Sequence, residues 1–164
     1  RRGRMMESSA GERMRLVSEI AIDRSPEAVW NYLQSVPNIA KWDRGVARTE
    51  MTGAIPEGGV GTEFRTFARS EGDDWGSMAY RVASVEENCC RVDLTSREGN
   101  ARFFREASWT FKASPLAEGT LLTCIADFTF RLPFLFLAPI LYLKREAITA
   151  DLRSLKCAIE NPGR

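Results

Sequence analysis

The chain has 164 residues, with 23 Lys and Arg against 22 Asp and Glu and no His. This length fits one domain with a sizeable core, and the near balance of charge argues against a nucleic-acid-binding protein. The absence of His excludes Ser-His-Asp and Cys-His catalysis and most zinc chemistry.

The first segments of the chain predict a tail, a strand and two short helices. Residues 1–14 are polar and rich in small side chains, which predicts a disordered tail or residues added for expression. Apolar and polar side chains alternate over residues 15–23, as in a β-strand. Ser25 and Pro26 then predict a helix start, because Ser caps free N–H groups and Pro suits the first helical position. A second short helical turn is expected at 38–43.

The middle of the chain is typical of strands separated by short turns. The expected strands are 44–53, 60–69, 74–85, 89–97, 101–113 and 120–131. Connections this short join antiparallel neighbours, so these strands should form a meander. With the first strand, the sequence predicts a seven-stranded antiparallel sheet in one domain at residues 15–160.

Alternation within the strands indicates which side chains share a face of the sheet. The predicted inner rows contain Phe64, Thr66 and Ala68; Met78, Tyr80 and Val82; Phe103, Arg105, Ala107, Trp109 and Phe111; and Leu122, Cys124, Ala126, Phe128 and Phe130. A β-bulge would move part of a row to the other face. We therefore expect an inner face rich in aromatic side chains, with one charged residue, Arg105, among them.

The C-terminal segment predicts one long helix, from about Pro139 to Glu160. Its apolar residues recur at helical spacing and form one stripe. The stripe consists of Leu141, Ile148, Leu152, Leu155 and Ile159. Such a helix is roughly 30 Å long, which is about the length of a strand of nine or ten residues. The predicted fold is therefore α+β, with the sheet curved around this helix.

An apolar run at residues 132–143 overlaps the start of that helix and contains two prolines. A bilayer span needs about 20 apolar residues, so the run is too short to cross a membrane. We interpret it as a lid over a cavity mouth, which leaves transient contact with a membrane open. The sequence predicts a soluble protein without a transmembrane segment.

The four cysteines predict no metal site and no disulfide framework. Cys89, Cys90, Cys124 and Cys157 lack Cys-x-x-Cys spacing, and neighbours on a strand point to opposite faces. Reduced thiols, together with the lack of an apolar signal-peptide core, predict a cytoplasmic protein. No cofactor is expected.

The order of these elements is the helix-grip arrangement: a strand, two short helices, a six-stranded meander and a long final helix. In this respect the sequence resembles the START-like (SRPBCC) superfamily, and within it the branch of polyketide cyclase/dehydrase and lipid-transport proteins. The resemblance runs from about Val17 to Glu160. The segments that carry it are Ser25-Pro26-Glu27-Ala28-Val29-Trp30, Trp42, Gly59-Val60-Gly61-Thr62-Glu63-Phe64, Gly119-Thr120, Asp151-Leu152 and Leu155-Lys156.

This resemblance implies a cavity between the curved sheet and the long helix. Its mouth would be lined by residues 132–143 and by the region around Ile39 and Trp42. The aromatic inner rows suit a hydrophobic ligand. The candidate ligand-binding residues are Met78, Tyr80, Phe103, Arg105, Trp109, Phe128, Phe130 and Phe136. The alternative is that these aromatic side chains only fill the core.

Two of these candidates carry polar groups. Arg105 is the expected anchor for an anionic group of a ligand; the alternatives are a rim position or an ion pair with Asp127 or Glu106. Tyr80 is expected to donate a hydrogen bond into the cavity, unless it is a core residue with a backbone partner. No pair of carboxylates is expected on one cavity wall, and no catalytic residue is identified.

Three functions are compatible with the sequence. The first is binding or transport of a hydrophobic or amphipathic small molecule or lipid. The second is a polyketide cyclase or dehydratase that uses neither a metal nor His. The third is a protein-interaction module of the same fold. The first is favoured, since no catalytic group stands out, while the oligomeric state and the ligand stay open.

Overall fold

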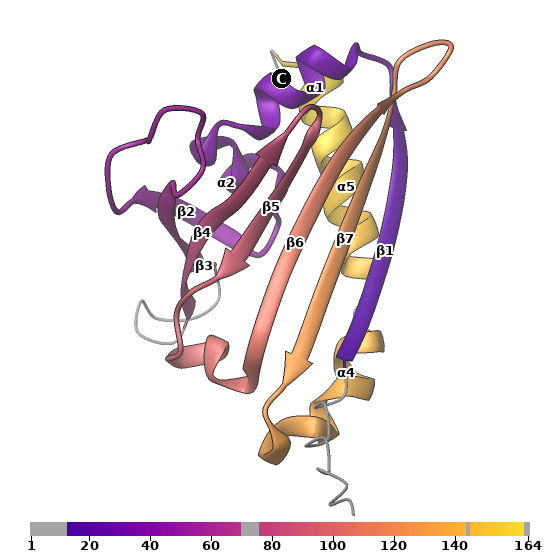
Figure 1. The fold of residues 1–164 in the computed structure, drawn as a ribbon. Coiled ribbons are helices and arrows are strands. Elements are labelled where there is room, and N and C mark those ends of the chain that lie inside the picture. Colours follow the sequence, from indigo (N-terminus) through magenta and orange to yellow (C-terminus); the bar gives the residue numbers. More distant parts are fainter. Residues whose placement is uncertain (1–12, 70–75, 144, 163–164) are drawn as a thin grey trace, which may run out of the picture.

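The computed structural model describes residues 13–69, 76–143 and 145–162. Its seven strands form an antiparallel sheet with the order β1-β7-β6-β5-β4-β3-β2 (Figure 1), which confirms the predicted meander and the seven-stranded sheet, and the first strand pairs with the last. Of the tail expected at residues 1–14, residues 1–12 lie outside the described residues, as do residues 70–75, whereas Arg13 and Met14 belong to the first strand. The strands are β1 (Arg13–Ile22), β2 (Val46–Met51), β3 (Glu63–Ala68), β4 (Ser77–Glu86), β5 (Cys89–Leu94), β6 (Phe104–Pro115) and β7 (Thr120–Phe130).

Two short helical segments follow β1, as predicted. In α1 (Pro26–Leu33) the Ser25 side chain accepts a hydrogen bond from the Ala28 backbone N–H at 3.3 Å, so Ser25 caps the helix and Pro26 begins it. A 3-10 turn, η1 (Val36–Asn38), then leads into α2 (Ile39–Trp42). The short elements therefore cover only part of one sheet face.

The C-terminal segment consists of a 3-10 helix and two α-helices. These are η3 (Leu132–Leu137), α4 (Ala138–Leu143) and α5 (Arg145–Glu160). The helix expected over residues 139–160 is thus described as α4 and α5, on either side of residue 144, which lies outside the described residues. The long helix α5 packs against β1 and α2 and crosses behind β7 in Figure 1.

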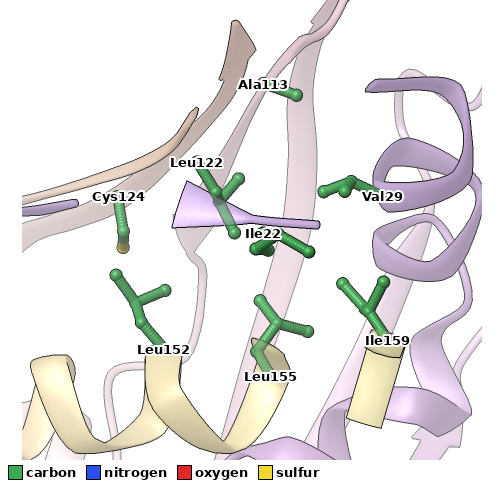
Figure 2. Close-up of a cluster of buried hydrophobic side chains, with 8 residues drawn as sticks. All are labelled: Ile22, Val29, Ala113, Leu122, Cys124, Leu152, Leu155 and Ile159. Carbon is green, nitrogen blue, oxygen red and sulfur yellow. The ribbon is translucent and has the colours of Figure 1, made fainter. Parts of the chain in front are cut away.

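The predicted helical stripe forms the centre of one hydrophobic core, called here the α5 core. Leu152, Leu155 and Ile159 are 1%, 0% and 6% exposed. They point toward Leu122 and Cys124 of β7 and the other residues of this cluster in Figure 2. These side chains are almost fully buried, so α5 packs closely on β7 at this point. The α5 core consists of Ile22, Val29, Ala113, Leu122, Cys124, Leu152, Leu155 and Ile159.

A second hydrophobic core lies under η3 and α4, and is called here the η3 core. It includes Phe128 and Phe130 of β7, which are 4% and 2% exposed. The inner side chains of the apolar run, Leu135, Leu137 and Leu141, pack against it. The apolar run is therefore anchored to the sheet along one side.

A β-bulge in β6 changes which of its residues face inward. The pairing with β7 shifts between Phe104 and Glu106. Phe104 takes the inward position, with its ring centroid 5.3 Å from those of Phe128 and Phe130. Phe103 belongs instead to the 3-10 helix η2 (Gly99–Phe103). The row predicted from Phe103 to Phe111 therefore holds only from Ala107 onward.

Candidate functional site

A cavity of about 840 Å³ lies over the part of the sheet that α5 does not cover. Its floor comes from β3, β4, β5 and β6, and its walls from α1, η1, α2 and the segment 51–62 that joins β2 to β3. Ligand sites of proteins span roughly 300–1,000 Å³, so the cavity has the size of a small-molecule site. None of its lining residues comes from α4 or α5.

This position differs from the one expected. The sequence predicted a cavity between the sheet and the long helix, with residues 132–143 at its mouth. The side chains of Leu152 and Leu155 fill the space under α5, and those of Leu135 and Leu137 face the η3 core. The open volume therefore lies beside the long helix, where short helices and a loop roof the sheet.

The cavity wall is mainly apolar and aromatic. The Phe64 and Tyr80 rings stack at a centroid distance of 5.3 Å, and Tyr80 meets Trp109 edge-on at 5.5 Å. On the helical side, Trp42 contacts Phe111 at 6.1 Å in a T-shaped arrangement. Aromatic rings at these distances and angles hold one another in place. The apolar lining residues are Trp30, Leu33, Val36, Ile39, Trp42, Val46, Met51, Ile55, Phe64, Val82, Val85, Val92, Trp109 and Phe111.

Asp43 is the carboxylate that lines the cavity. It directly follows α2, and its Oδ1 accepts a hydrogen bond from the Gly45 backbone N–H at 2.9 Å. Burial raises the pKa of this carboxyl, and the negative charge of Asp151 raises it further, against the opposing effect of backbone hydrogen bonds and of Arg69. The Asp43 side chain therefore holds a proton more readily than an ordinary carboxyl does.

The second carboxylate, on Asp151 of α5, is held by Arg44. The Arg44 backbone N–H donates to Asp151 Oδ1 at 3.3 Å, and the Arg44 Nε lies 3.6 Å from the same oxygen. Burial raises the pKa of Asp151, while the bonds and charge of Arg44 act against that rise. Asp151 does not line the cavity, so it acts on Asp43 only through its charge.

Tyr80 adds a hydroxyl group to the cavity wall. This hydroxyl donates to the Met78 sulfur at 3.3 Å. Burial raises the pKa of Tyr80 well above its ordinary value, with a smaller contribution from Asp43, whereas a hydrogen bond with Thr66 lowers it. The hydroxyl therefore stays protonated at physiological pH, and it can donate a hydrogen bond to a ligand if the ligand replaces the Met78 sulfur, which is a weak acceptor.

Cys90 lines the same cavity as a protonated thiol. Burial raises its pKa to about 11, and neighbouring Cys89 adds to the effect. Because the thiolate is the nucleophilic form of Cys, this side chain is not prepared for covalent catalysis. Among residues 13–69, 76–143 and 145–162, no cluster of three or more Cys, Asp or Glu side chains could hold a metal ion.

The cavity gathers some of the residues expected at the site. Tyr80 and Trp109 line it, as do Ile39 and Trp42, which were expected at its mouth. Met78 does not line the cavity, but its sulfur accepts a hydrogen bond from the Tyr80 hydroxyl, which does.

The other expected site residues lie elsewhere. Phe128 and Phe130 are buried in the η3 core. Phe103 packs edge-on against Phe134 at a centroid distance of 5.1 Å, and Phe136 is 68% exposed on η3. Arg105 is exposed beside the β6 bulge, because the bulge removes it from the inward row. Asp127 instead pairs with Arg15 at 2.8 Å.

Asp43 is the functional candidate that sequence reasoning missed. Asp43 directly follows Trp42, which was expected at the cavity mouth, and this position in the sequence could have indicated that it lies near the cavity. Phe64 and Thr66 were assigned to an inner row and do line the cavity. Segment 51–62 was missed because its contribution to the wall depends on how the loop folds back.

None of the helices in the described part of the chain is long and apolar enough to cross a membrane.

Solved structures of known proteins share this fold over nearly the whole chain. A norcoclaurine synthase of Thalictrum flavum, solved with a transition-state analogue, superposes with a TM-score of 0.74 at 12% identity, covering 96% of this chain and all of that one. The Zhui aromatase/cyclase of Streptomyces sp. R1128 gives 0.73 at 18% identity, with 93% of this chain and 97% of that chain covered. A START superfamily protein of Mycobacterium smegmatis gives 0.72 at 17% identity, with 90% and 98% covered. At these identities the likeness concerns the fold alone.

No curated protein sequence matches the chain significantly. A family profile does match: that of polyketide cyclase / dehydrase and lipid transport proteins, over residues 13–160. The match covers all the described strands and helices, and the helix-grip fold described above is consistent with it. The chain therefore belongs to the polyketide cyclase / dehydrase and lipid transport family.

Proposed function

We propose that this protein binds and carries an apolar or amphipathic small molecule, a lipid or a flat aromatic compound, in the cavity between β3–β6 and the short helices. The observation that carries this proposal is an open volume of about 840 Å³ with a mainly aromatic and aliphatic wall. A sheet packed only for stability would fill such a space, since protein interiors are close-packed.

Two polar groups in the cavity narrow the class of ligand. The Tyr80 hydroxyl can donate a hydrogen bond, and the Asp43 carboxyl can accept one or, when protonated, donate one. Both lie in the cavity wall. The favoured ligand is therefore a flat or chain-like apolar molecule with a carbonyl, hydroxyl or amine group, and not a pure hydrocarbon.

A second candidate function is catalysis of a cyclase or dehydratase type. The observation that favours it is Asp43, whose pKa is raised by burial, in the same cavity wall as the protonated hydroxyl of Tyr80. An aromatase/cyclase is among the structural neighbours. The open volume supports both functions over the protein-interaction module, which needs no cavity.

A fluorescent polyaromatic probe tests the binding proposal. We expect micromolar affinity, equivalent to about −8 kcal/mol. Val92→Phe should place a ring in the cavity from its floor and weaken binding, whereas Val17→Phe, a substitution of a 57% exposed residue on β1, should leave binding unchanged. Equal binding by parent and Val92→Phe would show that the probe does not occupy this cavity.

The variant Asp43→Asn distinguishes a carrier function from a catalytic one. The variant keeps an oxygen that can accept the Gly45 hydrogen bond but cannot exchange a proton. If the protein is a carrier, neutral probes should bind the variant as well as the parent. If it is an enzyme, turnover of a poly-β-ketone substrate should be lost while binding persists.

A further inference from the structure

The segment 132–143, formed by η3 and α4, exposes a cluster of large apolar side chains. Leu132, Phe136 and Leu143 are 70%, 68% and 74% exposed, and Ile140 and Tyr142 are each 51% exposed. Elsewhere in the described part of the chain, exposed large apolar side chains occur singly or as two residues on the loop before β3. These are Val17, Ile55, Val60 and Leu116. We call the cluster on 132–143 the apolar end surface.

The side chains of the apolar end surface belong to neither of the two hydrophobic cores. The opposite side of the same segment supplies the contacts with the body, since Leu135, Leu137 and Leu141 pack against the η3 core and Phe134 packs on Phe103. A surface helix usually places polar residues on its outer side, whereas this segment is apolar on both sides. An exposed patch of this kind marks a contact with another apolar phase or partner.

Cations border the apolar end surface. Arg131 precedes the segment and donates from its Nε to the Phe104 carbonyl at 3.2 Å. Arg145 follows it, with the guanidinium 4.6 Å from the centre of the Tyr142 ring. The sequence contains no Asp or Glu between these two arginines, and Glu146 is the first carboxylate beyond them. In a chain of net charge +1, this is a local excess of positive charge.

The surface is separate from the cavity. No residue of 132–143 lines the cavity. In Figure 1, η3 and α4 lie at the lower end of the sheet, and the turn between β6 and β7 lies at the opposite end with α1. Contact at the apolar end surface therefore leaves the cavity walls uncovered.

We propose that the apolar end surface docks the protein on the surface of an anionic lipid bilayer. Leu132, Phe136 and Leu143 enter the boundary between headgroups and acyl chains, and Arg131 and Arg145 reach the anionic headgroups. A protein that does not span the membrane is held on such a surface by two contributions: apolar side chains that enter the lipid and basic residues that contact anionic headgroups. A second copy of the chain fits less well, because a symmetric contact would bring the same arginines toward one another.

Vesicle flotation with the complete protein tests this proposal. We expect binding to vesicles of phosphatidylcholine with about one third phosphatidylglycerol, and at least about tenfold weaker binding to phosphatidylcholine alone. Phe136→Ser combined with Leu143→Ser should weaken binding by at least about tenfold, because both side chains are exposed and lose their apolar contact with the lipid. The matched control is Val60→Ser with Leu116→Ser, which are 47% and 43% exposed outside the segment and should change nothing.

Charge variants and a hydrodynamic measurement complete the test. Arg131→Gln with Arg145→Gln should reduce the preference for anionic vesicles, and circular dichroism should show that all variants keep the parent fold. Equal binding to neutral and anionic vesicles, or unchanged binding by the Phe136/Leu143 variant, would overturn the proposal. So would a dimer in sedimentation analysis that the same variant converts to a monomer, since the surface would then hold a second copy.

Discussion

The part of the sheet under α5 and the part under α1 and α2 differ in what occupies the space above them. Under α5, Leu122, Leu152 and Leu155 are at most 1% exposed. Under the short helices, Val82 and Val92 of the same sheet face an open cavity. The strands of both parts follow the same alternation, so a strand pattern alone does not decide between core and cavity. The covering element decides: a long helix with a leucine stripe fills the space, whereas short helices and a loop leave it open.

The two parts meet at Trp109 of β6. Its side chain packs against the α5 core, and its ring lies 5.5 Å from the Tyr80 ring of the cavity wall. Phe111 lines the cavity and also packs against the α5 core. Strand β6 is therefore the boundary at which the packed part supports the wall of the open part.

The largest effect on stability is expected in the packed part. Leu155→Ala should lower the free energy of unfolding by about 2–5 kcal/mol, because the side chain is 0% exposed and its removal leaves a void. Leu116→Ala, at a 43% exposed position, should cost less than about 0.5 kcal/mol. Urea titration measures both. Similar values for the two variants would show that α5 does not fill the space beneath it.

Substitutions that enlarge a side chain should have different effects on stability in the packed part and in the open part. Ala113→Phe adds volume to the α5 core, where Ala113 is 2% exposed, and should cost about 1–3 kcal/mol or more through overpacking. Val92→Phe adds volume at the cavity floor and should cost less than about 1 kcal/mol, because the ring enters open space. Thermal unfolding compares the variants at equal concentration. An equal loss for both would mean that the floor at Val92 is packed as tightly as the core.

The smallest expected effect concerns Asp43 and pH. Its raised pKa means that the folded state holds more protons than the unfolded state between the ordinary and the raised value. In that window, this group makes the free energy of unfolding fall as pH rises. Asp43→Asn should therefore be more stable than the parent at pH 7, by about 1 kcal/mol or less.

The advantage of Asp43→Asn should disappear at a pH below the ordinary carboxyl value of about 4, where the parent side chain is neutral as well. Urea titrations at several pH values measure the difference between parent and variant. A variant less stable than the parent at pH 7 would show that the Asp43 carboxylate stabilises the fold through its backbone bonds and Arg69.

Much of the fold could be predicted because its signals are local. The stripe ending in Leu152, Leu155 and Ile159, the capping Ser25 and the alternation along β7 each depend on residues close in sequence. The bulge at Phe104 could not be placed, because Phe103 and Phe104 are both apolar and either could continue the inward row. That single displacement accounts for the positions of Phe103 and Arg105.

The site was less accessible to prediction than the fold. Tyr80 and Trp109 were expected at the cavity because they lie on inward rows of regular strands. Phe128 and Phe130 lie on an equally regular row, but η3 and α4 pack over them. A cavity is space that no side chain fills, so its location depends on how distant segments meet. The sequence pattern contains no direct signal for that.

Trp30, Trp42 and Trp109 all line the cavity, and the fourth tryptophan of the chain, Trp75, lies outside the described residues. A molecule that enters the cavity therefore comes into contact with most of the indole rings that the protein possesses. The intrinsic emission of the unlabelled protein becomes a direct report of occupancy, by quenching when the guest is aromatic and by a blue shift when it displaces water. This fluorescence comes from the protein itself and needs no added dye. Libraries of metabolites can therefore be screened directly against the purified protein.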